Sequence, residues 1–314
     1  MKCFSRVAFP GGNRYTARII MERAQQTIAA RLSCRAYSGE PLSAEHITRI
    51  ESLISEDLQG PLGTPVRIAL VENSPVTSGE LEGRFSYGSV HGAPYLLVPM
   101  VPRSRHAMED LGAVVERVIL ELEREGIASC WFAGNFAESR VAREAGADGD
   151  ELLPAVVTIG YRAHRRTASE GPARFSVGAR KRKPWQELFF ELEFWDEEQR
   201  PHAPPSPLTP PDAPDYQEML DAMRLAPSTS NSQPWRVFRY STDTGPDHLH
   251  LFLRRNAGMD KVIRDIDIQK VDIGAAMAHF TAVAEELRMS GQWVYDRPRY
   301  LPSGLEYMAT WQEG

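Results

Sequence analysis

Two cations and a hydroxyl alternate near the start of the chain, at Arg31, Ser33 and Arg35. Because successive side chains of an extended segment point to opposite sides, all three would face the same way. Such a surface can bind an anion through both guanidinium groups and donate a further hydrogen bond from the hydroxyl. Tyr37 follows in the same alternation. A phosphate site and a solvated basic turn after a helix are both compatible with these residues alone.

A second polar cluster lies about 200 residues downstream, in residues 226–235. Pro227 must end any helix that precedes it, because proline cannot continue the backbone hydrogen bonding. Ser228 and Asn231 are short polar side chains that suit turns and can offer hydrogen bonds outward. Trp235 then enters a strand. A helix-to-strand turn with a core tryptophan is the plainer interpretation of the same residues.

A third cluster is the basic run at residues 180–183, in which Arg180 and Arg182 alternate. Alternating guanidinium groups can bind phosphate. Runs of this kind are also often solvated charge clusters. The run alone leaves both interpretations open.

Taken together, the clusters resemble a known family. Residues 31–37 resemble the R-x-S-x-R-x-[YF] signature that opens flavin-dependent nitroreductases, and residues 226–235 resemble their A-P-S-x-x-N-x-Q-P-W segment. In ordinary members these motifs meet across a homodimer, and each flavin mononucleotide (FMN) lies between subunits. Here one chain carries one copy of each motif. The resemblance, over about residues 20–195 and 215–312, is to the single-chain, internally duplicated type, and it implies a fused dimer with one complete flavin site.

The resemblance also implies roles for individual residues. The first motif would contact the phosphate, ribityl chain and pyrimidine edge of FMN, and the second would contact the flavin from the opposite half. The basic run would close over the phosphate, and the backbone at Ala133 and Gly134 would lie over the ring. A glycine-rich segment at residues 87–94 resembles one in the duplicated type. The implied cofactor-binding residues are Arg31, Ser33, Arg35, Gly88, Ala133, Gly134, Arg180, Arg182, Pro227, Ser228, Asn231 and Trp235.

The activity implied by the resemblance is that of an FMN-dependent NAD(P)H oxidoreductase. NADH or NADPH would pass hydride to flavin N5 and leave, and an electron-poor acceptor such as a nitroaromatic or quinone would follow in the same space. The chemistry belongs to the cofactor, so no catalytic side chain and no metal site is expected. Dehalogenation, substrate oxidation and flavin fragmentation on the same fold stay open, as does a role in flavin binding, storage or sensing.

The order of elements along the chain predicts an internal duplication. Each part shows a helix, two strands, a long helix and a closing strand. The long helices would begin at Asp110 and Asp272 and end near Gly126 and Gly291, and each initial aspartate lies 21 positions before a tryptophan. The resemblance implies a nitroreductase-like α+β fold of two pseudo-symmetric halves. We assign residues 1–195 to the first half, 196–214 to an extended proline-rich linker and 215–314 to a shorter second half.

In the first half, the position that corresponds to the second motif is the loop Gly60–Thr64, which lacks the serine and asparagine. The second half has no R-x-S-x-R. We therefore expect the second of two symmetric cofactor sites to be lost.

Composition narrows the range of partners and cellular locations that the chain could have. The chain has 314 residues, 42% of them hydrophobic, and a net charge of −6, which argues against broad nucleic-acid binding. No apolar run reaches the ~20 residues of a membrane helix. The three cysteines are widely spaced and form no disulfide framework, which suits a reducing compartment. We expect a cytoplasmic monomer, an intramolecular pseudo-dimer, with a small-molecule electron acceptor as its partner.

Overall fold

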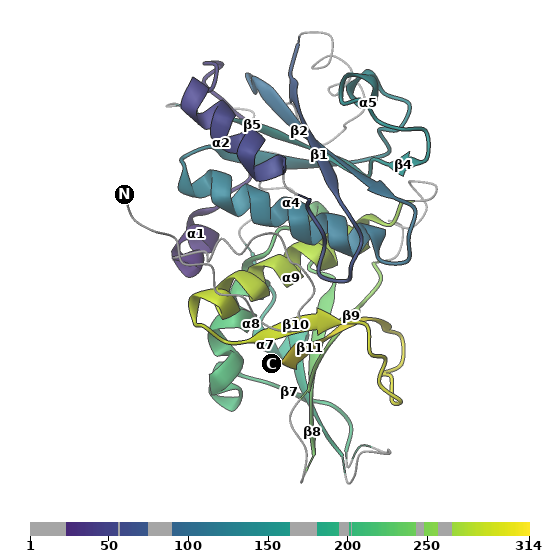
Figure 1. Cartoon of the computed structure of the whole chain (residues 1–314). Helices are drawn as coiled ribbons and strands as arrows, with labels where there is room; N and C mark the ends of the chain where they lie inside the picture. The colour runs from purple at the N-terminus through teal and green to yellow at the C-terminus, as the bar shows by residue number, and fades with distance from the viewer. Residues whose placement is uncertain are drawn as a thin grey trace.

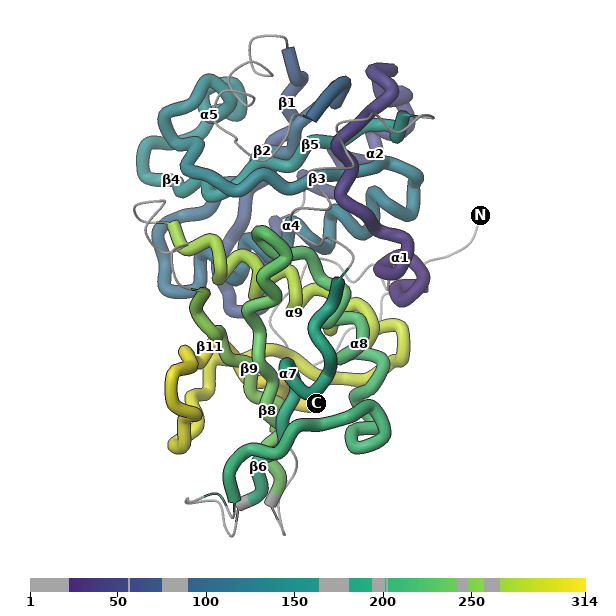
Figure 2. The backbone as a smooth tube through the Cα atoms, turned by 180° about the vertical axis from the view of Figure 1, so that it is seen from behind, coloured from purple at the N-terminus to yellow at the C-terminus, as the bar shows by residue number. Residues whose placement is uncertain are grey.

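The computed structural model describes residues 23–55, 57–74, 90–163, 181–194, 201, 203–242, 248–256 and 266–314. Gly88 and Arg180, both predicted to bind cofactor, lie outside these ranges. The described elements form two β-sheets with the two longest helices between them (Figure 1). The same layers are visible from behind (Figure 2).

The first half contains helices packed on an antiparallel sheet. Its central helix is amphipathic and packs its apolar stripe against the strands, while nearly all of its other residues, acidic ones included, are buried as well. The elements are α1 (Ala24–Ala30), α2 (Ala44–Ile54), β1 (Arg67–Glu72), β2 (Tyr95–Pro102), α4 (Ala107–Arg124), β3 (Ala128–Ala133), α5 (Arg140–Glu144), β4 (Glu151–Leu152) and β5 (Ala155–Gly160).

The second half is built around α9, whose residues are buried nearly all round. A helix of this kind belongs in a core with partners on every side. The remaining elements are α7 (Trp185–Leu188), β6 (Phe189–Phe194), β7 (Ser206–Pro207), η1 (Pro210–Asp212), η2 (Pro214–Tyr216), α8 (Gln217–Leu225), η3 (Thr229–Asn231), β8 (Trp235–Thr242), β9 (His248–Leu253), α9 (Ile268–Glu286), β10 (Gly291–Val294) and β11 (Glu306–Glu313).

The two sheets repeat one topology. The first has the order β1-β2-β5-β3, and the second contains β8-β9-β11-β10 in the corresponding order. All these pairings are antiparallel. The long helices α4 and α9 occupy the same place in each repeat. The predicted α+β fold with two pseudo-symmetric halves is therefore confirmed.

The halves meet where α4 crosses α9. A Cβ added to Gly112 would lie 2.2 Å from the carbonyl oxygen of Val271, and one added to Gly274 would lie 1.9 Å from that of Glu109. Only glycine permits this approach of two backbones. Each glycine stands two residues after an equivalent aspartate. Asp110 accepts from the amides of Leu62 and Thr64, and Asp272 accepts from that of Thr229.

The sheets divide the chain differently from the predicted boundary at residue 195. Strand β6 pairs in parallel with β8, so it lies in the second sheet although its sequence precedes the linker. The linker is also not wholly extended. Pro207 pairs with β6, and prolines begin the 3-10 turns η1 and η2, where their missing N–H costs no hydrogen bond.

The ends of the long helices also depart from expectation. Helix α4 begins at Ala107 and α9 at Ile268, three and four residues before the predicted aspartates. Gly126 follows the end of α4 with a φ of 77°, as expected, but Gly291 is the first residue of β10. Among the described residues, no helix combines the length and apolar character needed to cross a membrane.

Candidate functional site

The first motif lies along the edge of the first sheet. The amide of Cys34 donates to the carbonyl of Ser129 in β3, and the Tyr37 hydroxyl donates to the carbonyl of Thr158 in β5. Cys34 is buried, as expected for a small core side chain, whereas Ser33 and Arg35 are only partly buried. The motif is thus held by Cys34 and Tyr37, and parts of Ser33 and Arg35 between them stay accessible.

Arg31 is the buried member of the motif. Its side chain is 5% exposed and its Nε lies 2.9 Å from Glu116 Oε1 on α4. Its Nη2 is buried and makes no hydrogen bond within the described part of the chain. A buried polar group that lacks a partner is costly. This nitrogen is therefore a candidate ligand-binding donor.

The second motif forms a tight loop between α8 and β8. Ser230, Asn231 and Gln233 all have left-handed backbones, with φ of 52°, 52° and 48°. Such strain in residues other than glycine is concentrated at functional sites. The amide of Gln233 donates to Ser228 Oγ over 2.9 Å. Because that contact uses the hydroxyl as an acceptor, its proton can still be donated to a ligand.

The third motif is held by the second. Asn231 Nδ2 donates to the carbonyl of Lys181 at 2.8 Å, and Arg182 Nη1 donates to Asn231 Oδ1 at 3.0 Å. The amide of Lys183 donates to Gln233 Oε1 at 2.8 Å. Two segments about 50 residues apart in sequence therefore form one unit.

The first motif approaches the same unit. Burial lowers the pKa of Arg182, and the positive charge of Arg31 lowers it further, followed by that of Arg224. Both cations are thus close enough to repel one another in a partly desolvated place. Arg31 comes from the first half, and Arg182 belongs to the segment that leads into the second sheet. The cluster suits an anion with more than one negative charge.

Other predicted positions are placed less favourably. Trp235 is fully buried in the core of the second half, so its side chain does not face a site. This corrects the expectation that it contacts the flavin and agrees with the core interpretation.

The amide of Gly134 already donates to the carbonyl of Pro154 at 2.9 Å. Ala133 ends β3, paired with Ala155, and Pro227 is partly buried at the end of α8.

Two buried residues that the motifs did not indicate, Glu116 in α4 and His279 in α9, contact each other between the two halves. Glu116 Oε1 lies 3.0 Å from His279 Nε2, and both side chains are 0% exposed. His279 stands inside the apolar run of α9, which is a visible signal in the sequence. Glu116 is surrounded by other charged residues in α4, so nothing in the sequence singles it out.

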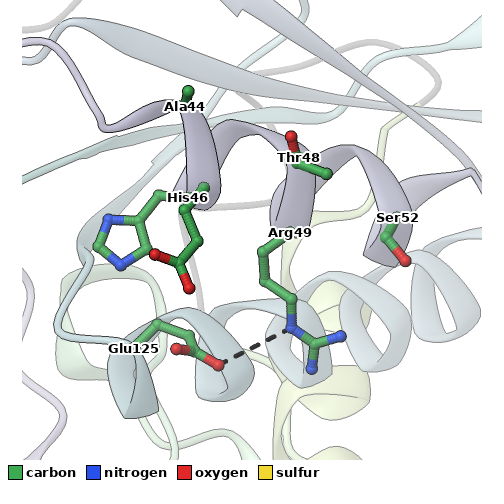
Figure 3. A pocket seen from close by; sticks show the side chains of 7 residues that line it. Ala44, His46, Thr48, Arg49, Ser52 and Glu125 are labelled. Carbon is green, nitrogen blue, oxygen red and sulfur yellow. Dashed lines mark ion pairs between the residues drawn. The ribbon is translucent and has the colours of Figure 1, made fainter.

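A separate groove lies between α2 and the end of α4, with a volume of about 590 Å³. Its lining is polar, and Figure 3 shows the guanidinium of Arg49 directed toward Glu125, with 3.8 Å between Nε and Oε1. The groove is lined by Ala44, Glu45, His46, Thr48, Arg49, Ser52 and Glu125. These seven include no predicted cofactor-binding residue.

Comparison with protein families gives a match to the model described as "Putative TM nitroreductase" over residues 23–284. Among solved structures, a putative nitroreductase from Thermotoga maritima is 17% identical with a TM-score of 0.51, over 96% of this chain and 97% of that chain. A nitroreductase with bound FMN from Bacteroides fragilis is 22% identical with a TM-score of 0.37, over 48% of this chain and 96% of that chain. Comparison with curated proteins finds no match.

The family match spans both halves, from the beginning of the described residues almost to the end of α9. The Thermotoga structure shares the fold over nearly the whole length of both chains. This chain therefore belongs to the Putative TM nitroreductase family and is a nitroreductase-type oxidoreductase.

Proposed function

We propose that this protein is an FMN-dependent NAD(P)H oxidoreductase with one flavin site between its two halves. Its electron acceptor would be a small, electron-poor molecule such as a nitroaromatic or a quinone. The observation that carries the proposal is the approach of Arg31, which is buried, and Arg182, which is half-buried, two cations that come from different motifs. Glu116 compensates Arg31 in part, and a phosphate monoester would supply about −1.5 to −2 further charges to the two cations.

The residues around this pair fit the phosphate end of FMN. Arg31 Nη2 is a buried donor without a hydrogen bond in the described structure, and guanidinium groups bind phosphate in a bidentate manner. Arg182 is oriented by Asn231, which fixes its guanidinium against the second motif. Arg180 would act beside it, although it lies outside the described residues.

The polar residues of both motifs fit the rest of the cofactor. Ser33 and Arg35 on one side and Ser228 and Asn231 on the other can donate to the ribityl chain and the ring edge. Pro227, Ala133 and Gly88 would add backbone walls. Gly134 could donate to the ring only if its bond to Pro154 is given up. The side chains thus bind and orient the cofactor, and none has to exchange a proton with the substrate.

Bound flavin would supply the redox chemistry, taking hydride from NADH or NADPH and passing two electrons to the acceptor. In this ping-pong scheme the reductant and the acceptor would use the same space in turn. The free cysteines Cys34 and Cys130 support a reducing, cytoplasmic location. We infer a monomer, because both motifs of the site are present in one chain.

The visible absorption spectrum tests this function. We expect added FMN to bind and its absorption to bleach when NADH or NADPH is added without oxygen, then to recover with a nitroaromatic or a quinone. Binding without bleaching would favour flavin storage or sensing. Bleaching with recovery only by halophenols would favour dehalogenation. Failure to bind FMN in excess would refute the proposal.

A further inference from the structure

Glu116 is a buried junction between the walls of the proposed site. It lies in the middle of α4 and is fully inaccessible to solvent. Its Oε1 contacts Arg31 Nε at 2.9 Å and His279 Nε2 at 3.0 Å, and its Oε2 accepts from Trp131 Nε1 at 2.7 Å. An arginine, a histidine and a tryptophan therefore converge on one carboxylate.

Each of these three contacts is made by a residue from a different element of the proposed site. Arg31 belongs to the first motif, and Trp131 precedes Ala133 and Gly134 in β3. His279 belongs to α9 of the second half, and its Nδ1 lies 3.0 Å from the carbonyl oxygen of Ala222. Ala222 lies in α8, whose end begins the second motif. The junction therefore fixes both halves of the site relative to each other.

The partner atoms define the protonation of His279. A backbone carbonyl can only accept, so Nδ1 must carry a proton. The carboxylate of Glu116 already accepts from Trp131 and pairs with Arg31. Burial raises the pKa of Glu116, whereas the charge of Arg31 and the hydrogen bond from Trp131 both lower it and favour the ionised carboxylate. An ionised carboxylate can only accept, so Nε2 must carry a proton as well.

We propose that His279 is a buried imidazolium and that Glu116 is the positioning residue that holds it and Arg31 beside the phosphate site. His279 and Arg31 share the single carboxylate of Glu116, and Arg182 adds a further positive charge close to Arg31, which leaves an excess of positive charge for the ligand. This charge would make the site select phosphorylated flavin over riboflavin. The selectivity rests on the proposed function, whereas the charge of His279 does not.

The other charged groups nearby do not cancel this excess. Glu123 is close enough to feel the charge of Arg31, but it is paired with Arg162 at 2.9 Å. Arg224 adds a further positive charge near Arg182. The elements that contact His279 supply Glu116 from α4 and the Ala222 carbonyl from α8.

The protein offers an internal contrast in His250. It is also buried in the second half, and its Nδ1 lies 2.7 Å from Thr310 Oγ1, an atom that can donate or accept. Burial lowers the pKa of His250 to about 3, with a further contribution from the charge of His248. His250 is therefore a neutral buried imidazole at pH 7.

The first test is nitrogen NMR of histidine rings in the flavin-free protein at about pH 7. His279→Gln and His250→Gln assign the two buried rings. We expect two protonated nitrogens for His279 and one for His250. A neutral ring at His279 would overturn the proposal, and this test does not require the protein to bind flavin.

The second test compares FMN with riboflavin. Loss of one buried charge should weaken FMN binding about tenfold in His279→Gln and leave riboflavin binding unchanged. His250→Gln is the matched control, because it removes a buried histidine that carries no charge, so its ratio of the two affinities should equal that of the wild type. Equal weakening of both ligands in His279→Gln would show a merely structural role. No binding of either ligand to the wild type would refute the flavin function and leave the NMR result standing.

Discussion

At the scale of single residues, the site combines cations that are costly to bury with one carboxylate that compensates them. Arg31 is paired with Glu116 and compensates its charge, so Arg31 has a structural role beside the binding role that we propose for it. Removal of one member of a buried ion pair leaves the other uncompensated. Substitutions here must therefore be judged by affinity and stability separately.

Arg31→Ala should weaken FMN binding by about 10- to 100-fold, since a charge-assisted hydrogen bond contributes about 1.5–3 kcal/mol. It should also lower the free energy of unfolding, because Glu116 loses a counter-ion. Fluorescence titration with FMN and urea denaturation measure the two effects. Arg67→Ala is the control, because it removes an arginine that pairs with Glu151 at a more exposed position, and it should leave FMN affinity unchanged. Unchanged FMN affinity in Arg31→Ala would exclude Arg31 from the site.

Asn231→Ala should also weaken FMN binding, although this residue lies in the other half. Asn231 holds both Arg182 and the carbonyl of Lys181, so its loss removes the side-chain partner that orients the Arg182 guanidinium. We expect a loss of affinity of about tenfold. Ser206→Ala, a change at an exposed residue of β7, is the control. Full FMN affinity in Asn231→Ala would contradict a site shared between the halves.

Asp272 should make stability depend on pH. Burial raises its pKa to about 8, although hydrogen bonds from Thr229 partly offset this. The folded state therefore keeps a proton that the unfolded state loses near pH 4, and stability falls as pH rises between these values.

In Asp272→Asn this dependence should disappear. From about pH 5 to about pH 8, the wild type should lose up to about 1.4 kcal/mol per pH unit relative to the variant. Urea denaturation at several pH values measures the difference, with Asp215→Asn as an exposed control. A constant difference between Asp272→Asn and the wild type across this range would contradict the raised pKa.

At the scale of elements, the close crossing of α4 and α9 positions both walls of the site. Glu116 and His279 can meet only because the two helix backbones approach closely at Gly112 and Gly274. A side chain at either glycine would push one backbone away from the other.

Gly274→Ala should therefore lower the free energy of unfolding by about 1–3 kcal/mol or more. It should also weaken FMN binding, because the two halves shift relative to each other. Gly149→Ala is a suitable control, since a Cβ there meets no atom within 4 Å. Thermal unfolding measures both variants. Equal stability of Gly274→Ala and the wild type would show that the crossing tolerates a side chain.

Many of the helices and strands are predictable from the sequence, because local patterns of residues determine them. The first helix of the first half, α2 (Ala44–Ile54), is such an element, and it is capped by Ser43, whose side chain accepts from the amide of His46. The family resemblance also assigns Arg182 and Asn231 to one site, and these two side chains are hydrogen-bonded to each other. The pairing of β6 with β8 could not be predicted, because it depends on contacts between segments about 50 residues apart. The Glu116–His279 contact spans 163 positions and was missed for the same reason.

At the scale of the whole molecule, the chain repeats one sheet topology around two crossed helices but keeps one set of motifs. In the first half, Asp110 holds the loop Gly60–Thr64, just as Asp272 holds the loop of the second motif. The first loop keeps the hydrogen bonds to its aspartate but lacks the serine and asparagine of the second motif. The scaffold is therefore duplicated, and we expect a single cofactor site.

The same arrangement predicts that one chain is sufficient to form the complete cofactor site. Sedimentation should show a monomer of about the chain mass of 35.2 kDa, with and without FMN. The two halves already meet within the chain, where α4 crosses α9. A dimer that forms only when FMN is added would show instead that a second chain completes the site.

The most direct test of the central claim is a titration with FMN that counts the sites per chain. We predict saturation at one FMN per chain, followed by bleaching of the bound flavin with NADH or NADPH in the absence of oxygen. Saturation at two would show that the second symmetric site is functional. No binding with FMN in excess would contradict the account, because the cluster of Arg31, Arg182 and Asn231 would then serve some purpose other than holding a flavin.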